Sequence, residues 1–170
     1  MKPMPSDDWL TKYSGEHLFH EFRMFWWLRQ NIPADRYLHD AALESFVLHL
    51  RNLIDFFYPR KSVQSSDVIA TDFLDDPATW DPPASISATL NAARDRADKE
   101  LSHLTAQRRD TGDPTKPWET DALFGEIKAV ADKFVAKASP KKLHQHVFEL
   151  LTALANLTHH YSPCIAYDSE

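Results

Sequence analysis

Apolar residues recur at steps of three and four along most of this chain, the spacing that places them on one face of an α-helix. Prolines cluster between these stretches, as expected where proline would break a helix. The predicted helices cover about 7–32, 34–58, 85–109, 118–138 and 140–160. Only three glycines occur, too few for a protein of many tight hairpins. The pattern therefore predicts an all-α fold, a single-domain bundle of about five helices spanning residues 1–170.

The ends of the predicted helices carry start signals. Ser6 suits the N-cap of the first helix, Pro33 the first position of the second, and Ser139-Pro140 the start of the fifth. The residues expected to face the core include Leu43, Phe46, Leu50, Leu53 and Phe57 in the second helix and Leu123, Ile127, Val130 and Phe134 in the fourth.

Residues 59–83 break the helical pattern. They combine a polar stretch with aspartate–proline turn sequences, which predicts a long irregular connection between the second and third helices. A connection of this length inside a compact domain is uncommon, so we expect it to wrap across the bundle. Phe73, Leu74 and Trp80 are the residues expected to pin it there. Residues 161–170 are expected to form a tail.

The first helix is crowded with aromatic residues, namely Phe19, Phe22, Phe25, Trp26 and Trp27. They extend more than halfway round a helix, which is more than one buried face needs. We expect this helix to occupy the core and to extend into a homodimer contact, while an aromatic ligand pocket is the less favoured alternative.

Composition and charge narrow the class of protein. The chain is 43% hydrophobic and 26% charged, as in globular domains, and its apolar runs are too short to span a bilayer. The N-terminal residues contain no apolar secretory segment, and the single cysteine, Cys164, suits a reducing compartment. We therefore expect a cytoplasmic protein without a membrane partner. A net charge of −6 argues against extensive coating of nucleic acid but not against a local basic site.

The second helix carries a polar cluster beside its apolar stripe. Arg51 and Asp55 are four residues apart, so they share a face and are able to pair, and Asn52 lies beside them. Two interpretations remain open. The cluster is either a half-buried ion pair at a helix–helix contact or a polar pocket in which Arg51 binds an anionic group.

The third helix carries a second polar cluster. Arg96, Glu100 and His103 project from one face, and the basic pair Arg108-Arg109 follows one turn later. A histidine beside arginines suits proton transfer and charge stabilisation at a phosphodiester. The alternative is a solvated face with an ordinary Arg96–Glu100 pair.

Several segments together resemble a group of small bacterial proteins and the broader HEPN-like helical-bundle superfamily. The resemblance rests on Glu44-Ser45-Phe46, Arg51-Asn52-Leu53-Ile54-Asp55-Phe56-Phe57, Leu101-Ser102-His103-Leu104-Thr105 and Trp118. Its hallmark is an arginine, usually followed by a polar residue, with a histidine a few positions later. Arg51-Asn52 match the opening but lack the histidine, whereas Arg96 and His103 match the spacing but have Ala97 as the neighbour.

This resemblance implies an all-α bundle, frequent dimerisation and, in many members, metal-independent RNA cleavage in toxin–antitoxin or phage-defence settings. It assigns catalytic roles to His103, Arg51 and Arg96. The residues expected to bind RNA or a nucleotide are Asn52, Asp55, Glu100, Arg108 and Arg109. The competing hypothesis is a non-catalytic helical module that acts as a homodimer or binds a protein partner.

Histidines invite a metal-site interpretation as well. Glu100 and His103 form one Glu-x-x-His element, of which di-iron bundles use two, and the sequence holds no second copy. His17, His20 and Glu21 are close on the first helix, yet they do not make a complete set of ligands at the usual spacing. We expect neither a metal nor another cofactor.

Overall fold

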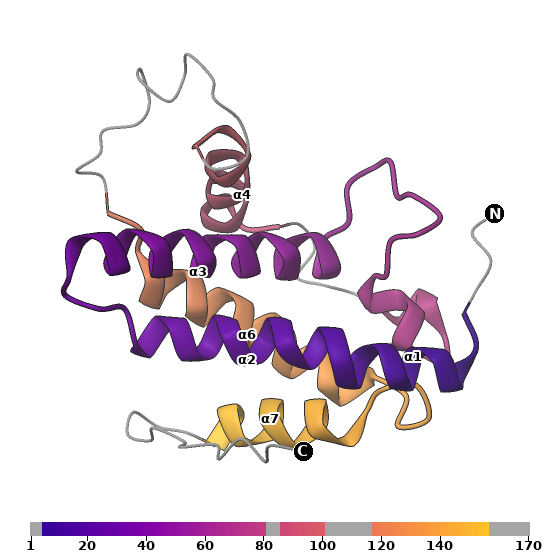
Figure 1. Ribbon diagram of the computed structural model, residues 1–170. Helices are drawn as coiled ribbons and strands as arrows, with labels where there is room; N and C mark the ends of the chain where they lie inside the picture. The colour runs from indigo at the N-terminus through magenta and orange to yellow at the C-terminus, as the bar shows by residue number, and fades with distance from the viewer. Residues whose placement is uncertain (1–4, 81–85, 101–116, 157–170) are drawn as a thin grey trace.

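The computed structural model describes residues 5–80, 86–100 and 117–156, and the regular elements in these ranges are all helical (Figure 1). The all-α prediction is confirmed. Helices α2 (Phe19–Gln30) and α3 (Arg36–Phe57) lie side by side, and α6 (Thr120–Lys137) passes behind them (Figure 1). Helix α7 (Gln145–Asn156) covers the far side of α2, and α4 (Ala88–Glu100) crosses α3 on the opposite side (Figure 1). None of the helices in the described ranges combines the length and apolar character needed to cross a bilayer.

The first predicted helix is continuous but contains a wider turn. It comprises α1 (Asp7–Tyr13), the π-helical turn η1 (Ser14–Leu18) and α2 (Phe19–Gln30). Ser6 caps its start as predicted, because its side chain accepts a hydrogen bond from the Trp9 backbone N–H at 3.3 Å. The π-turn was not predicted, since a single wide turn leaves the apolar spacing on either side nearly unchanged.

Helix α3 (Arg36–Phe57) is the longest element and the centre of the fold. Its start differs from the prediction, because Asp35 and not Pro33 opens it. The Asp35 carboxylate accepts hydrogen bonds from the backbone N–H groups of Tyr37 and Leu38, both at 3.1 Å. Four of the five residues predicted to face the core are buried, and only Leu43, near the start, is partly exposed.

The irregular connection that follows α3 is described for residues 59–80, and this part packs against the bundle. It contains two short 3₁₀ turns, η2 (Ala70–Phe73) and η3 (Pro77–Thr79). Phe73 and Leu74 are fully buried, and the Trp80 indole donates a hydrogen bond to the Phe57 carbonyl at 3.4 Å.

Helices α4 (Ala88–Glu100), α6 (Thr120–Lys137) and α7 (Gln145–Asn156) complete the bundle. The predicted start of the last helix at Pro140 was wrong. Residues 140–143 form a turn, and His144 precedes the helix, with its Nδ1 accepting a hydrogen bond from the His146 backbone N–H at 3.1 Å. Buried Ser139 instead ties this turn to the wrapped connection, since its N–H bonds the Phe73 carbonyl at 2.9 Å.

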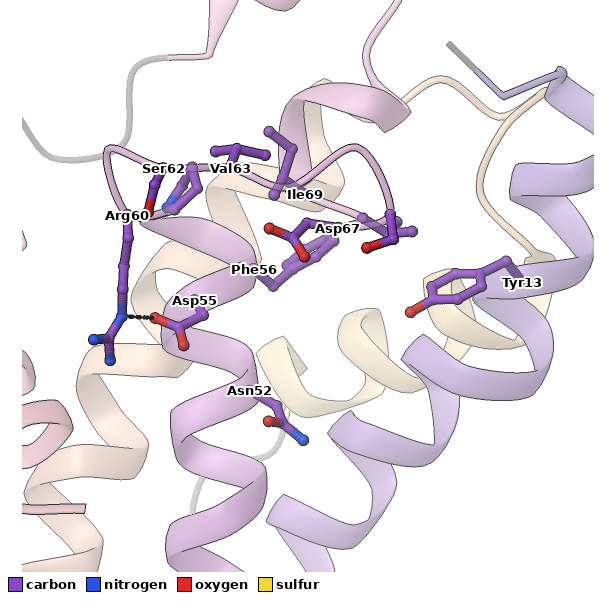
Figure 2. A pocket seen from close by; sticks show the side chains of 12 residues that line it. Tyr13, Asn52, Asp55, Phe56, Arg60, Ser62, Val63, Asp67 and Ile69 are labelled. Carbon is purple, nitrogen blue, oxygen red and sulfur yellow. Dashed lines mark hydrogen bonds and ion pairs between the residues drawn. The ribbon is translucent and has the colours of Figure 1, made fainter. Parts of the chain in front are cut away.

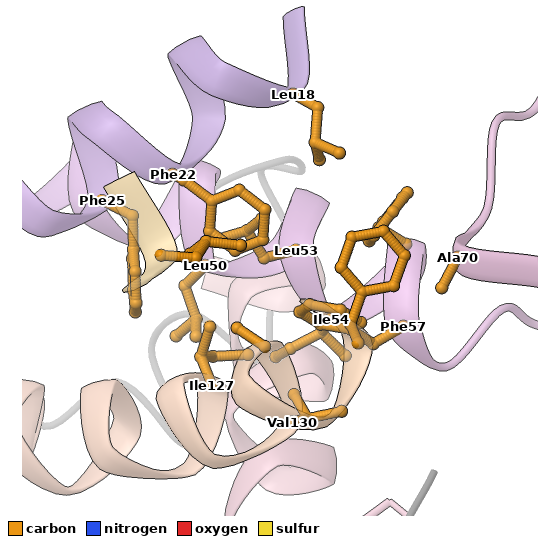
Figure 3. Close-up of a cluster of buried hydrophobic side chains, with 14 of the residues drawn as sticks. Leu18, Phe22, Phe25, Leu50, Leu53, Ile54, Phe57, Ala70, Ile127 and Val130 are labelled. Carbon is orange, nitrogen blue, oxygen red and sulfur yellow. The ribbon is translucent and has the colours of Figure 1, made fainter. Parts of the chain in front are cut away.

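The core lies between α2, α3 and α6 (Figure 3). Phe134 of α6 is central to it, packing edge to face against Phe56, Phe57 and Phe73 at centroid distances of 5.3–6.0 Å. The predicted stripe of α6 is buried throughout. This core fixes one side of α3 and leaves its other side free to carry polar residues.

Candidate functional site

A network of ion pairs joins α3 to α4. Asp98 of α4 accepts hydrogen bonds from Arg51 and Arg60, each at 2.6 Å. Arg60 also reaches Asp55 at 3.4 Å, and Arg94 lies 3.7 Å from the same Asp55 oxygen. Arg51 and Asp55, which the sequence would allow to pair directly, have other partners here. The two residues are connected through Asp98 and Arg60, because Asp98 on the crossing helix offers Arg51 a closer partner. We call these five residues the arginine network.

The arginine network holds three guanidinium groups and two carboxylates, so one positive charge is left over. The side chains of Arg51 and Arg60 are 32% and 45% exposed, whereas that of Arg94 is 15% exposed. Arg94 anchors α4, because it donates to the Tyr58 carbonyl at 3.2 Å and to Asn91 at 2.9 Å. Arg51 and Arg60 are therefore the members that a ligand in solution can reach.

Nearby charges and burial shift the pKa of the Asp98 carboxyl in opposite directions. Burial by itself would raise the pKa of its carboxyl, but the hydrogen bonds and positive charges of Arg60 and Arg51 outweigh it and hold the pKa below its usual value. The hydrogen bond to Asp98 likewise raises the pKa of the Arg60 guanidinium. Both groups are charged at neutral pH.

A groove of about 370 Å³ opens beside the network, between α1, the end of α3 and the wrapped connection (Figure 2). Two of the predicted binding residues, Asn52 and Asp55, line it. Tyr13 faces them from α1, and Arg60 stands at the edge (Figure 2). The remaining lining residues are Phe56, Pro59, Ser62, Val63, Ser66, Asp67, Val68 and Ile69. The groove thus has an apolar floor and a rim of polar groups.

Asn52 is held by a pair of residues that the sequence analysis did not assign to this site. Its amide donates to Glu21 Oε2 at 3.2 Å, and the same oxygen lies 2.8 Å from Nδ1 of His49. His49 is a buried residue, and the Glu21 side chain is 26% exposed. Burial, and then the negative charge of Glu21, raise the pKa of Tyr13. The sequence carried one signal for this contact, because the spacing of His49 and Asn52 places both residues on one side of α3.

Arg96 and Glu100 form a separate contact. Arg96 donates to Glu100 at 2.7 Å and to the Pro117 carbonyl at 3.3 Å, and its guanidinium lies 4.1 Å from the centre of the Trp118 ring. The predicted Arg96–Glu100 pair is therefore present. His103, Arg108 and Arg109 lie outside the described residues.

The aromatic residues of the first helix fall into a buried group and a more exposed group, as their spacing around the helix predicts. Phe22, Phe25 and Trp26 are buried, Phe19 is partly exposed, and Trp27 is 50% exposed. Other large apolar side chains are exposed as well, namely Trp9, Tyr37, Leu38, Leu48 and Val63. The described part of the chain holds no group of three or more His, Cys, Asp or Glu side chains arranged to bind a metal ion.

Comparisons of the chain with family models, with curated proteins and with solved structures found no match.

Proposed function

We propose that this protein binds RNA through the arginine network and the adjoining groove. The observation that carries the proposal is that three arginines share only two aspartates at the edge of a groove of about 370 Å³, within a chain whose net charge is −6. The excess of positive charge lies in the network itself, since Asp67 adds a carboxylate to the groove lining, and such a local excess in an acidic protein provides a discrete site for an anion.

The chemistry of the network favours phosphate. Guanidinium groups donate in a planar fork that matches two phosphate oxygens, and such charge-assisted bonds are stronger than neutral ones. Arg51 and Arg60 keep part of their surface in water, so a phosphate can approach them without unfolding the α3–α4 contact. The phosphate would then compete with Asp98 for both side chains.

The groove suits a single-stranded segment better than a duplex. Single-stranded RNA exposes bases that stack on flat side chains and bond through their edges, whereas phosphate contacts alone carry no sequence information. The polar rim, with the Tyr13 hydroxyl, offers hydrogen bonds to base edges, and Phe56 offers an aromatic surface, in a groove that Arg60 also lines. The HEPN-like resemblance implies a toxin–antitoxin or phage-defence setting for such binding.

The resemblance extends the proposal to metal-independent cleavage. A 2′-hydroxyl would attack the adjacent phosphorus and the P–O5′ bond would break, leaving a 2′,3′-cyclic phosphate and a 5′-hydroxyl. His103 would transfer the proton between these two oxygens, and Arg51 or Arg96 would stabilise the charge on the phosphorane.

Binding of a fluorescent single-stranded RNA by the full chain tests the first part. We expect Arg60→Gln and Arg51→Gln each to weaken binding and to lower the dependence of log Kd on log salt by about 1, as for one lost phosphate contact. Arg36→Gln is the matched control, because Arg36 is exposed on the same helix about 22 Å from Arg51 along its axis. Equal losses in all three variants would contradict the proposal.

Cleavage is tested separately with labelled RNA in the presence of a chelator. We expect wild-type protein to release a cyclic-phosphate product and His103→Ala to release none. Equal cleavage by both proteins, or none by either, would refute the catalytic part and leave the binding part to stand on the arginine variants.

A second candidate function is a homodimer formed through the aromatic residues of the first helix. It is favoured by Trp27, which remains 50% exposed beside the buried Trp26. Light scattering of wild-type protein and Trp27→Ser tests it. A dimer that the substitution dissociates supports this function, and a wild-type monomer at high concentration contradicts it.

A further inference from the structure

We infer that the groove binds a nucleobase and prefers guanine, whose edge presents two adjacent hydrogen-bond donors. This inference rests on the proposed RNA binding, and it concerns the groove rather than the arginines that would bind phosphate. It follows from the acceptor-rich wall that α3 presents to the groove.

The first acceptor is the free side of Asp55. Both of its ion pairs, with Arg60 and Arg94, use the oxygen Oδ1. In Figure 2 the Asp55 carboxylate points toward Arg60, at the edge of the groove that Asp55 lines, and within the described residues its Oδ2 has no ion-pair partner. The ion pairs with Arg60 and Arg94 hold this carboxylate in place, and its oxygens accept hydrogen bonds.

The second acceptor is Asn52, one helical turn before Asp55. Its amide nitrogen is bonded to Glu21 Oε2, and Glu21 is bonded in turn to His49. This anchor leaves the carbonyl oxygen of Asn52 on the Asp55 side (Figure 2). Glu21 and His49 are thus positioning residues for the groove, because they determine which end of the Asn52 amide faces a ligand.

The floor and the facing wall suit a flat ring. Phe56, Val68 and Ile69 supply apolar surface, and Tyr13, whose ring stacks on Trp9 at 5.0 Å, points its hydroxyl toward the groove from the facing side (Figure 2). A volume of about 370 Å³ lies within the range of small-molecule sites. Stacking on aromatic side chains stabilises any base, so the hydrogen-bonding wall has to provide the selectivity.

Guanine fits this wall better than the other bases. Its N1–H and exocyclic amine are two adjacent donors, which Asp55 Oδ2 and the Asn52 carbonyl oxygen would accept. Uracil offers one N–H between two carbonyl oxygens. These oxygens would lie against the acceptor oxygens of α3, with which they form no hydrogen bond. Adenine and cytosine each offer an exocyclic amine beside an unprotonated ring nitrogen, so they satisfy only part of the wall.

Displacement of a labelled oligo(U) RNA by free nucleotides tests the preference. We expect GMP to compete about tenfold better than UMP, and better than IMP, which lacks the exocyclic amine. Asp55→Asn should bring the GMP/UMP ratio close to one. The ratio is the readout because the same change also frees Arg60 and Arg94, which strengthens phosphate binding of every nucleotide alike. Asp75→Asn, an exposed carboxylate in the connection outside the groove lining, should keep the wild-type ratio.

The outcomes separate this inference from the proposed function. Arginine-dependent RNA binding with equal competition by GMP, IMP and UMP would overturn the guanine preference alone. Preference for GMP without oligo(U) binding, measured by calorimetry, would overturn RNA binding and support the groove. A GMP/UMP ratio that survives in Asp55→Asn would also overturn the inference, provided that circular dichroism shows the variant to be folded.

Discussion

The two sides of helix α3 differ in the kind of contact that they make with neighbouring elements. On one side Phe46, Leu50, Leu53 and Phe57 are buried against α2 and α6, where apolar contact needs shape but no particular partner. On the other side Arg51 and Asp55 each depend on individual charged atoms, supplied by α4 and by the wrapped connection. The apolar side therefore stabilises the fold, and the polar side positions the groups that would bind a ligand.

A leucine on the buried side of α3 should contribute far more to the free energy of unfolding than a leucine on the exposed side. Leu50 is 1% exposed and Leu48, two residues earlier on the same helix, is 51% exposed. We expect Leu50→Ala to lower the free energy of unfolding by about 2–5 kcal/mol. Leu48→Ala should change it by less than about 0.5 kcal/mol. Urea unfolding followed by circular dichroism measures both, and similar losses in the two variants would contradict the assignment of the core.

Two helical glycines extend the contrast between packed and open positions. A Cβ added to Gly15 in η1 would lie 2.8 Å from two carbons of the His144 ring, whereas one added to Gly125 in α6 would meet nothing within 4 Å. We expect Gly15→Ala to destabilise the protein by about 1–3 kcal/mol. Gly125→Ala should stabilise it by about 0.5–1 kcal/mol, because alanine favours the helix. The opposite signs are visible as opposite shifts of Tm, and a stabilising Gly15→Ala would contradict the packing of η1 against His144.

On the polar side of α3, the contribution of Asp98 to the free energy of unfolding should be smaller and should depend on pH. Because the folded protein lowers the pKa of Asp98, this group stabilises the fold above its unfolded pKa of about 4, and the stabilisation is lost as the pH falls through the lower folded value. We expect the difference in free energy of unfolding between wild type and Asp98→Asn to be constant from pH 7 to about 5 and to shrink in more acidic solution. A difference that does not change between pH 6 and pH 3 would contradict the pairing of Asp98 with Arg51 and Arg60.

The apolar side was predictable from sequence and the polar side was predictable only in part. A period of three to four residues identified the buried face of α3 and of α6 because burial depends on spacing along one helix. Asn52 and Asp55 were placed in a polar cluster for the same reason, and both line the groove. The partners of Arg51 and Asn52 were not predictable, since Asp98 and Glu21 lie 47 and 31 residues away in the chain. Spacing within α3 does not say which residues the crossing helices bring to it.

The helix starts show a similar limit. Pro33 and Ser139-Pro140 are good local start signals, yet α3 begins after Asp35 and α7 after His144. At Ser139 the backbone N–H donates to the Phe73 carbonyl, and the side-chain oxygen that would cap a helix is buried without a hydrogen-bond partner in the described part of the chain. The local start signal is therefore not used where the wrapped connection packs against this turn.

In the proposed function, phosphate competes with Asp98 for Arg51 and Arg60. The affinity of the full chain for one labelled single-stranded RNA tests this competition, measured at a fixed salt concentration for wild type, Arg60→Gln and Asp98→Asn. We expect changes of opposite sign: Arg60→Gln weakens binding because a phosphate contact is lost, and Asp98→Asn strengthens it because both arginines are released. Weaker or unchanged binding by a folded Asp98→Asn protein would show that phosphate does not compete with Asp98 for these arginines.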